Sequence, residues 1–183
     1  MPERLPDPSA PRMLLQTCGD IFAKLRWEAE ELARECDAYR AFNFAVTAHH
    51  LWTDWIDRAG TNDQKTRRRR VPNSAAKLSV IWRDIANASK HFVLDEKASR
   101  KQHVANVRGP YIGDWQAFFL NRPAIYVSDG AQVTDVPSLC NVTVQCLDWV
   151  LNGDAMEFPD HLNELAHVIW SPDAWLTDNT EGA

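Results

Sequence analysis

The chain has 183 residues, of which 45% are apolar and 25% charged, and its formal net charge is −5. A chain of this length can bury about 70% of its unfolded surface in one domain without disulfide or metal staples. No apolar run approaches the roughly 18 residues of a membrane span, and residues 1–6 lack the apolar core of a signal peptide. We therefore expect a soluble, cytoplasmic protein without a membrane partner.

The four cysteines occur without a C-x-x-C pair and without the spacing of a metal finger, at Cys18, Cys36, Cys140 and Cys146. Such usage indicates neither a disulfide framework nor a zinc site. We expect reduced, mostly buried thiols, no metal and no cofactor.

We expect one helical-bundle domain over residues 11–176, between loose tails at 1–10 and 177–183. Residues 1–10 carry three prolines and no periodicity. Pro11 suits the first turn of a helix. Apolar residues then recur at helical spacing as far as about Asp37, namely Leu14, Cys18, Phe22, Leu25, Ala29, Leu32 and Cys36. This pattern predicts a long amphipathic first helix.

Acidic residues line the outer side of this first helix. Glu28 and Glu31 lie on one side, and their carboxylates are able to ligate a metal. A di-metal bundle would need Glu-x-x-His pairs on facing helices. The interpretation that we favour is an acidic, solvated face.

A second helix is predicted over residues 38–59, and it is apolar over more than half of its circumference. Such a helix is typical of the middle of a bundle. His49 falls among Phe42, Ala45, Trp52 and Ile56, so we expect a buried core histidine bonded through one nitrogen. A small-ligand site near His49 and Trp52 would have no phosphate loop or cofactor fingerprint to support it.

A narrow polar strip runs along the same helix and consists of Asn43, Thr47, His50, Asp54 and Asp57. The strip faces either water or the third helix. In the second case Asn43, His50 and Asp54 would meet polar residues of the third helix across a cleft.

Positive charge is concentrated in the middle third of this acidic chain. Residues 58–108 contain 13 Lys or Arg and 4 Asp or Glu, whereas the remainder contains 7 and 21. Residues 65–70 include four successive arginines in a stretch with Gly60, Asn62 and Pro72, which predicts a loop. Four arginines repel one another unless a polyanion neutralises them. The alternatives are a solvated loop or pairing with acidic protein, either in this chain or in a partner subunit.

The nucleic-acid-binding candidates are therefore the cations of this basic region. They are Arg67, Arg68, Arg69, Arg70, Lys90, Lys97, Arg100 and Lys101.

A third helix is predicted from Asn73 or Ser74, which are natural N-caps, to about Leu94. Its buried stripe consists of Leu78, Ile81, Ile85, Ala88 and Phe92. At about 100° per residue, Asp84, Asn87 and His91 form a polar strip beside that stripe, and Arg83 and Lys90 lie together on the far side. A carboxylate, an amide and an imidazole therefore line one edge of a buried face.

Short apolar segments separated by turn residues follow the third helix, at 103–108, 115–120, 124–127 and 131–134. They predict a small β insertion over about 103–136, with the strongest hairpin turn at 128–130. Helix returns at Pro137 with Asp135 as a cap and ends at Gly153, and another helix begins at Pro159. The predicted fold is mainly α: an antiparallel bundle of four to five helices with a small β-hairpin insertion between the third and fourth helices.

The residues Arg83, Asp84, Asn87 and His91 resemble the R…N…H signature of the HEPN superfamily. Many of its members are ribonucleases of bacterial toxin–antitoxin, phage-defence and CRISPR systems. The resemblance implies metal-independent RNA cleavage with His91 as general base or acid. Asp84 or Asn87 would orient the imidazole, and Arg83 or Lys90 would neutralise the phosphate. It also implies a homodimer, because such sites commonly form where two copies of the third helix meet.

Two functions are therefore expected from the sequence. The first is RNA cleavage or RNA binding by a HEPN-like protein of a defence or toxin–antitoxin system. The second is a non-catalytic adaptor or antitoxin-like subunit, whose tryptophan-rich surface and arginine run bind protein or nucleic acid. In the second case Asn87 and His91 only bond neighbouring groups inside the bundle.

Overall fold

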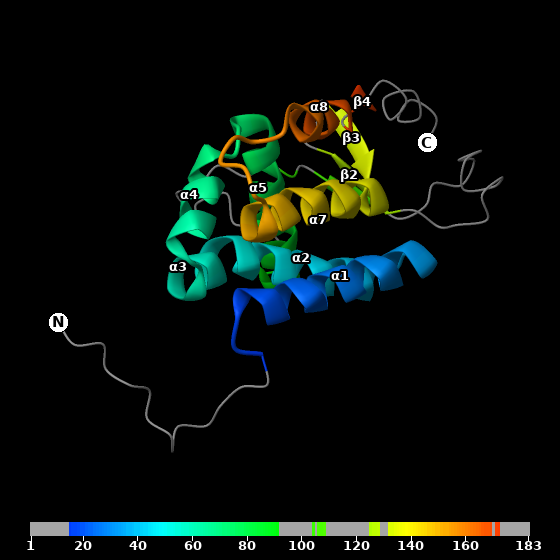
Figure 1. Cartoon of the computed structure of the whole chain (residues 1–183). Coiled ribbons are helices and arrows are strands. Elements are labelled where there is room, and N and C mark those ends of the chain that lie inside the picture. The colour runs from blue at the N-terminus through cyan, green and yellow to red at the C-terminus, as the bar shows by residue number, and fades with distance from the viewer. Residues whose placement is uncertain are drawn as a thin grey trace, which may run out of the picture.

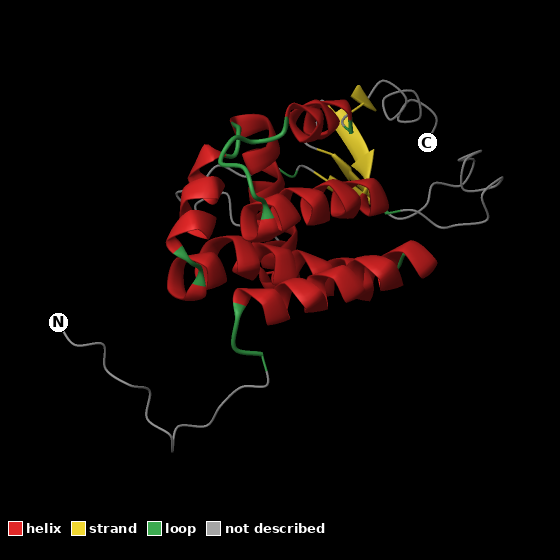
Figure 2. Cartoon of the chain, in the orientation of Figure 1, coloured by secondary structure: helices red, strands yellow, loops and turns green. Residues whose placement is uncertain are grey.

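The computed structural model describes residues 15–91, 104, 106–108, 125–128, 132–169 and 171–172; side chains are described for the same residues except 88–91, 106–108 and 171–172. These residues form a mainly helical bundle with a small sheet beside α8 and the start of α7 (Figures 1 and 2). In the described part of the chain, no helix has the length and apolarity needed to cross a membrane.

Helix α1 spans Cys18–Arg34 and starts later than the sequence predicts. A capping box sets this start, because Thr17 Oγ1 accepts the N–H of Asp20 and Asp20 Oδ2 accepts the N–H of Thr17 (3.1 and 2.9 Å). The extended backbone at Thr17 ends any continuation of α1 toward the N-terminus, and Pro11, the predicted first turn, lies outside the described residues.

The predicted second helix is confirmed, but it contains a π-helical turn. Helix α2 spans Ala38–His50, the π-helical turn η1 spans Leu51–Trp55, and α3 spans Ile56–Ala59. Its N-cap is Asp37, whose carboxylate accepts the N–H of Arg40 (2.9 Å).

The loop predicted for residues 65–70 is wrong, because these residues lie in helix α4, Asn62–Arg70. Thr61 and Gln64 form a capping box at its start. Arginine is a good helix former, and Gly60 and Pro72 bound this short helix on its two sides. The described residues therefore hold one helix more than the sequence predicts.

Three further helices agree with the predicted elements: α5 at Asn73–His91, α7 at Val136–Asn152 and α8 at Asp160–Val168. Helix α5 begins at Asn73 itself, and Ser74 Oγ donates to Asn163 Oδ1 on α8 (2.5 Å). Asp135 caps α7 as expected by accepting the N–H of Ser138 (2.8 Å).

The β insertion is confirmed as part of an antiparallel sheet of order β1-β2-β3-β4. The strands are Asn106–Arg108, Tyr126–Ser128, Gln132–Asp135 and Ser171–Pro172. The predicted hairpin pairs β2 with β3, and Val127 lies opposite Thr134. The predicted segment at 115–120 lies outside the described residues. The N–H of Val136 donates to the carbonyl of Ile125 (2.8 Å), which fastens the sheet to α7.

Trp82 joins three helices at the centre of the core. It is 1% exposed, and its Nε1 donates to Thr143 Oγ1 of α7 (2.7 Å). That hydroxyl donates in turn to the carbonyl of Leu139 (2.7 Å), and the Trp82 ring meets Phe44 of α2 edge to face. The buried face of α5 is wider than the predicted stripe, which omitted Trp82, because α5 packs against α2, α7 and α8 at once.

We expect Thr143→Val to destabilise the fold by about 1–3 kcal/mol, because the buried indole N–H of Trp82 loses its acceptor. Chemical denaturation by urea measures this loss. Thr66→Val is the matched control: the Thr66 hydroxyl also donates to a carbonyl four residues earlier, that of Asn62 (2.8 Å), but accepts from no indole. Its expected effect is within about 0.5 kcal/mol. Equal losses in the two variants would contradict a role for the indole bond.

Candidate functional site

The polar strip of α5 is partly inside the protein. Asp84 is 3% exposed, and its Oδ1 accepts from Nη2 and Nε of Arg83 (2.7 and 3.0 Å). Its Oδ2 accepts the backbone N–H of Val104 (3.2 Å). The carboxylate thus fastens the chain segment before β1 to α5, and it neutralises the guanidinium next to it.

The structure describes the side chains of only some of the candidate catalytic residues. Arg83 and Asn87 are half-buried. The backbones of Lys90 and His91 belong to α5, but their side chains lie outside the described residues. Three candidate nucleic-acid-binding residues, Lys97, Arg100 and Lys101, also lie outside them.

Arg67 is buried and donates hydrogen bonds to the C-terminal end of α7. Its Nε donates to the carbonyl of Val150 (2.9 Å) and its Nη2 to that of Leu151 (3.2 Å), which also accepts from Gln64 Nε2 (3.0 Å). The last carbonyls of a helix have no partner within the helix, and a cation there also interacts favourably with the helix dipole. Arg67 therefore caps α7.

The other arginines of the run lie in different environments. Arg68 Nη1 donates to the carbonyl of Trp52 (2.7 Å), and its Nη2 pairs with Asp57. Arg70 is exposed and its Nη1 donates to the carbonyl of Met156 (3.2 Å). Arg69 is exposed on α4. Three of the four guanidinium groups thus bond carbonyls of this chain.

Side chains supply hydrogen bonds around the π-helical turn. Besides Arg68, Thr53 Oγ1 donates to the carbonyl of His49 (2.8 Å) and Cys18 Sγ to that of Trp55 (3.3 Å). A π-helical turn interrupts the regular i to i−4 pattern and is frequent at functional sites. The turn lies directly after His50.

His50 and Asp54 form a hydrogen-bonded imidazole–carboxylate pair at the surface of the described bundle. His50 Nδ1 lies 2.7 Å from Asp54 Oδ2, and both side chains are nearly half exposed. An ionised carboxylate only accepts, so Nδ1 carries the proton and Nε2 of the neutral ring is an acceptor. The hydrogen bond from His50 is the main cause of the lowered pKa of Asp54. This pair has the geometry of an oriented general base.

The remaining polar strip of α2 does not form one cleft. Asn43 is exposed, whereas Thr47 is buried against α1 and Asp57 pairs with Arg68 of α4. His49 is half-buried, and its ring centroid lies 5.5 Å from that of His50. The strip is therefore divided among solvent, α1 and α4.

The solvated acidic face predicted for α1 is wrong for Glu28. Glu28 is 5% exposed and pairs with Lys24, whose Nζ also donates to Thr47 Oγ1 of α2 (2.5 Å). These three residues connect α1 to α2 through a part-buried polar contact. Glu31, by contrast, is only half-buried and pairs with Arg34.

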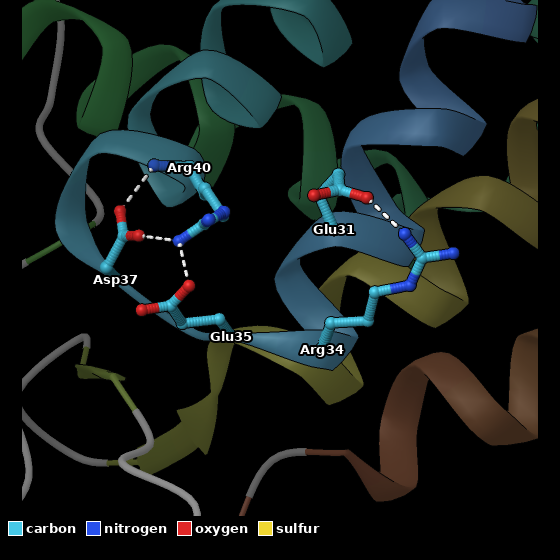
Figure 3. A network of polar contacts seen from close by, with 5 residues as sticks. All are labelled: Glu31, Arg34, Glu35, Asp37 and Arg40. Carbon is cyan, nitrogen blue, oxygen red and sulfur yellow. Dashed lines mark hydrogen bonds and ion pairs between the residues drawn. The ribbon is translucent and has the colours of Figure 1, made fainter.

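The turn between α1 and α2 carries a second network of charges (Figure 3). Arg40 Nη1 lies 2.9 Å from Glu35 Oε2 and also contacts the Asp37 carboxylate. The backbone N–H of Arg40 is the main cause of the lowered pKa of Asp37. Arg34 pairs separately with Glu31 (2.5 Å). These charges stabilise the turn by bonding one another.

The cysteines do not supply an activated nucleophile. Cys18, Cys140 and Cys146 are buried and Cys36 is half-buried, and all four are free. Burial is the main cause of the raised pKa of each thiol, and it raises the pKa of Cys146 to about 12. A protonated thiol is neither nucleophile nor metal ligand. Among the described residues, no three side chains of His, Cys, Asp or Glu gather to hold a metal ion.

No protein-family model, no curated protein and no solved structure matches the chain. The structure gives a mainly helical bundle with a small antiparallel hairpin. The HEPN resemblance stays a hypothesis that rests on the residues of α5.

Two features of the site were not predicted. The π-helical turn has no recognisable signal in the residues Leu51 to Trp55, because a π turn uses ordinary helix-forming residues. The sequence could have predicted the pairing of His50 with Asp54, because residues four apart on a helix are neighbours and both belonged to the predicted strip.

Arg67→Met should lower the free energy of unfolding by about 2–3 kcal/mol, because the buried carbonyls of Val150 and Leu151 lose charged donors. Arg69→Met makes the same substitution at an exposed position of the same helix. It should change the free energy of unfolding by less than about 0.5 kcal/mol. Urea denaturation of the two variants measures the difference. Equal effects would show that the cap on α7 contributes nothing to stability.

The Asp54 carboxyl should titrate below its ordinary pKa of 3.8, and in His50→Ala its midpoint should rise. Because the pKa is lowered in the folded state, the pair stabilises the fold above the unfolded pKa, and this contribution is lost as the pH falls through the folded pKa. NMR titration of the carboxyl carbon measures both midpoints. Asp37, whose pKa is lowered by a different donor, is the internal control and should not move. An unchanged Asp54 midpoint in the variant would contradict the pairing.

Proposed function

We propose that the chain is a non-catalytic helical interaction subunit, of the adaptor or antitoxin-like kind, which acts by binding protein or nucleic acid. One observation carries the proposal: Arg83, the cation of the R…N…H pattern, donates two hydrogen bonds to the buried carboxylate of Asp84. A catalytic cation must point at the charge that develops on the phosphate. Withdrawing Arg83 would remove the charged partner of a buried carboxylate, which is costly.

The arginine run favours protein over nucleic acid as the partner of such a subunit. A polyanion site needs cations that are free to contact phosphates. Arg67 and Arg68 instead donate to main-chain carbonyls of α7 and η1. The run therefore has an internal function that does not require a nucleic acid.

A second candidate function, metal-independent RNA cleavage, is favoured by a different observation. His50 is oriented by Asp54 and keeps nearly half of its side chain exposed. An imidazole fixed in this way can take a proton from a ribose 2′-hydroxyl near neutral pH. His91 of α5 is the alternative imidazole that the HEPN resemblance implies.

We expect purified protein to leave mixed RNA intact in the presence of EDTA, because Arg83 of α5 and three arginines of α4, Arg67, Arg68 and Arg70, are bonded within the chain. The experiment compares the wild-type protein with His50→Ala, His91→Ala and His167→Ala. His167 is exposed on α8 and serves as the matched control. RNA length is followed by electrophoresis, and circular dichroism checks that each variant is folded.

Cleavage that is lost in His50→Ala or His91→Ala, but kept in His167→Ala, would contradict the proposed interaction subunit and support RNA cleavage as the function. The variant that loses activity would also identify the imidazole. Cleavage that persists in all three variants would not depend on any of these histidines.

A further inference from the structure

The outer face of α1 is not covered by the described part of the bundle. Helix α1 packs against α2 and α7 and lies on the outside of the molecule (Figure 1). Its exposed residues on this side are Gly19, Ala23, Arg26, Trp27, Glu30, Ala33 and Arg34. At about 100° per residue they fall within about 120° of one another on the helix. They form one surface, called the α1 face below.

Two of the three charges on the α1 face, Arg26 and Glu30, have no partner among the described residues. Arg26 and Glu30 are exposed, and neither makes a hydrogen bond or an ion pair there. On the same helix, Lys24 pairs with Glu28, and Arg34, the third charge of the α1 face, pairs with Glu31. The α1 face therefore presents one unpaired cation and one unpaired anion, one turn apart.

The same face carries a large exposed apolar side chain. Trp27 is 59% exposed, although tryptophan is highly buried on average. Beside it, Arg26, Ala29, Glu30 and Ala33 of α1 line a cavity of about 310 Å³ that is closed on the other side by α7. An exposed tryptophan next to hollowed, small-residue surface is typical of the anchor of a protein interface.

We infer that the α1 face binds the same face of a second copy of the chain, with the two α1 helices antiparallel. The inference rests on the proposed function, a protein that acts by binding, and names one partner. A two-fold axis through position 28 places Arg26 of each copy opposite Glu30 of the other. The same register places Ala23 opposite Ala33, so the helices can approach closely. The two Trp27 side chains then meet near the axis.

The pattern favours a second copy over other partners. A two-fold interface must be self-complementary, because each surface meets itself. The α1 face satisfies this condition, since the pair Arg26 and Glu30 and the pair Ala23 and Ala33 share one midpoint, position 28. A polyanion would instead select a face of one sign, and Glu30 would repel it. This dimer uses α1 and differs from the third-helix dimer that the HEPN resemblance implies.

Charge reversal tests the inference through sedimentation velocity of the full chain across micromolar concentrations. The wild-type protein is expected to be a dimer. Arg26→Glu and Glu30→Arg should each weaken the dimer at least tenfold, because each places two like charges opposite each other. A mixture of these two variants should form a 1:1 heterodimer, because every Glu of one copy then meets an Arg of the other. Trp27→Ala should also weaken the dimer, by about tenfold.

Arg69→Glu is the matched control, since Arg69 is an exposed arginine on α4, and it should leave the dimer unchanged. A wild-type monomer at every concentration would overturn the inference. So would a dimer that is insensitive to both charge reversals, or two weakened variants that fail to associate when mixed. Each of these outcomes concerns only the α1 face, because the RNA assay decides separately between binding and cleavage as the function.

Discussion

The fold depends on the pairing of main-chain carbonyls that its helices cannot pair internally. The last turn of α7 and the π-helical turn after α2 both present such carbonyls to the interior, where an unpaired polar group costs about as much as a lost hydrogen bond. Arg67 and Gln64 satisfy the first set and Arg68 satisfies part of the second. Helix α4 thus bonds to both α7 and η1, although the sequence of its residues predicts a loop.

This constraint also changes what the arginine run means for function. Clustered arginines normally indicate a polyanion site, because their mutual repulsion has to be offset. Here the offset comes from carbonyl oxygens and from Asp57, within the same chain. Asp84 does the same for Arg83 on α5. The basic middle third of the sequence thus contains arginines that stabilise the bundle, and a charge count alone does not separate these from binding residues.

Periodicity predicted the helices well, because a buried stripe must repeat with the helix. Residue types, a capping aspartate and a turn signal at 128–130, located the cap at Asp135 and the hairpin that pairs β2 with β3. Neither periodicity nor residue type could predict partners that are far away in sequence. Nothing in the order of residues places Val104 against Asp84, or Thr47 against Lys24. For the same reason the candidate site was predicted as one strip of residue types, while the structure divides its members among several neighbouring elements.

Helix α1 shows why position decides the role of a charge. Lys24 and Glu28 have the same spacing and order as Arg26 and Glu30, with the cation first, which is the weaker orientation on an isolated helix. The first pair forms because Glu28 is buried, which strengthens the attraction between the charges, and because Thr47 accepts a further hydrogen bond from Lys24. The second pair lies in water and does not form within the helix. Arg26 and Glu30 therefore stay available to a partner surface that presents an anion and a cation in the reverse order. The α1 helix of a second, antiparallel copy presents them in that order.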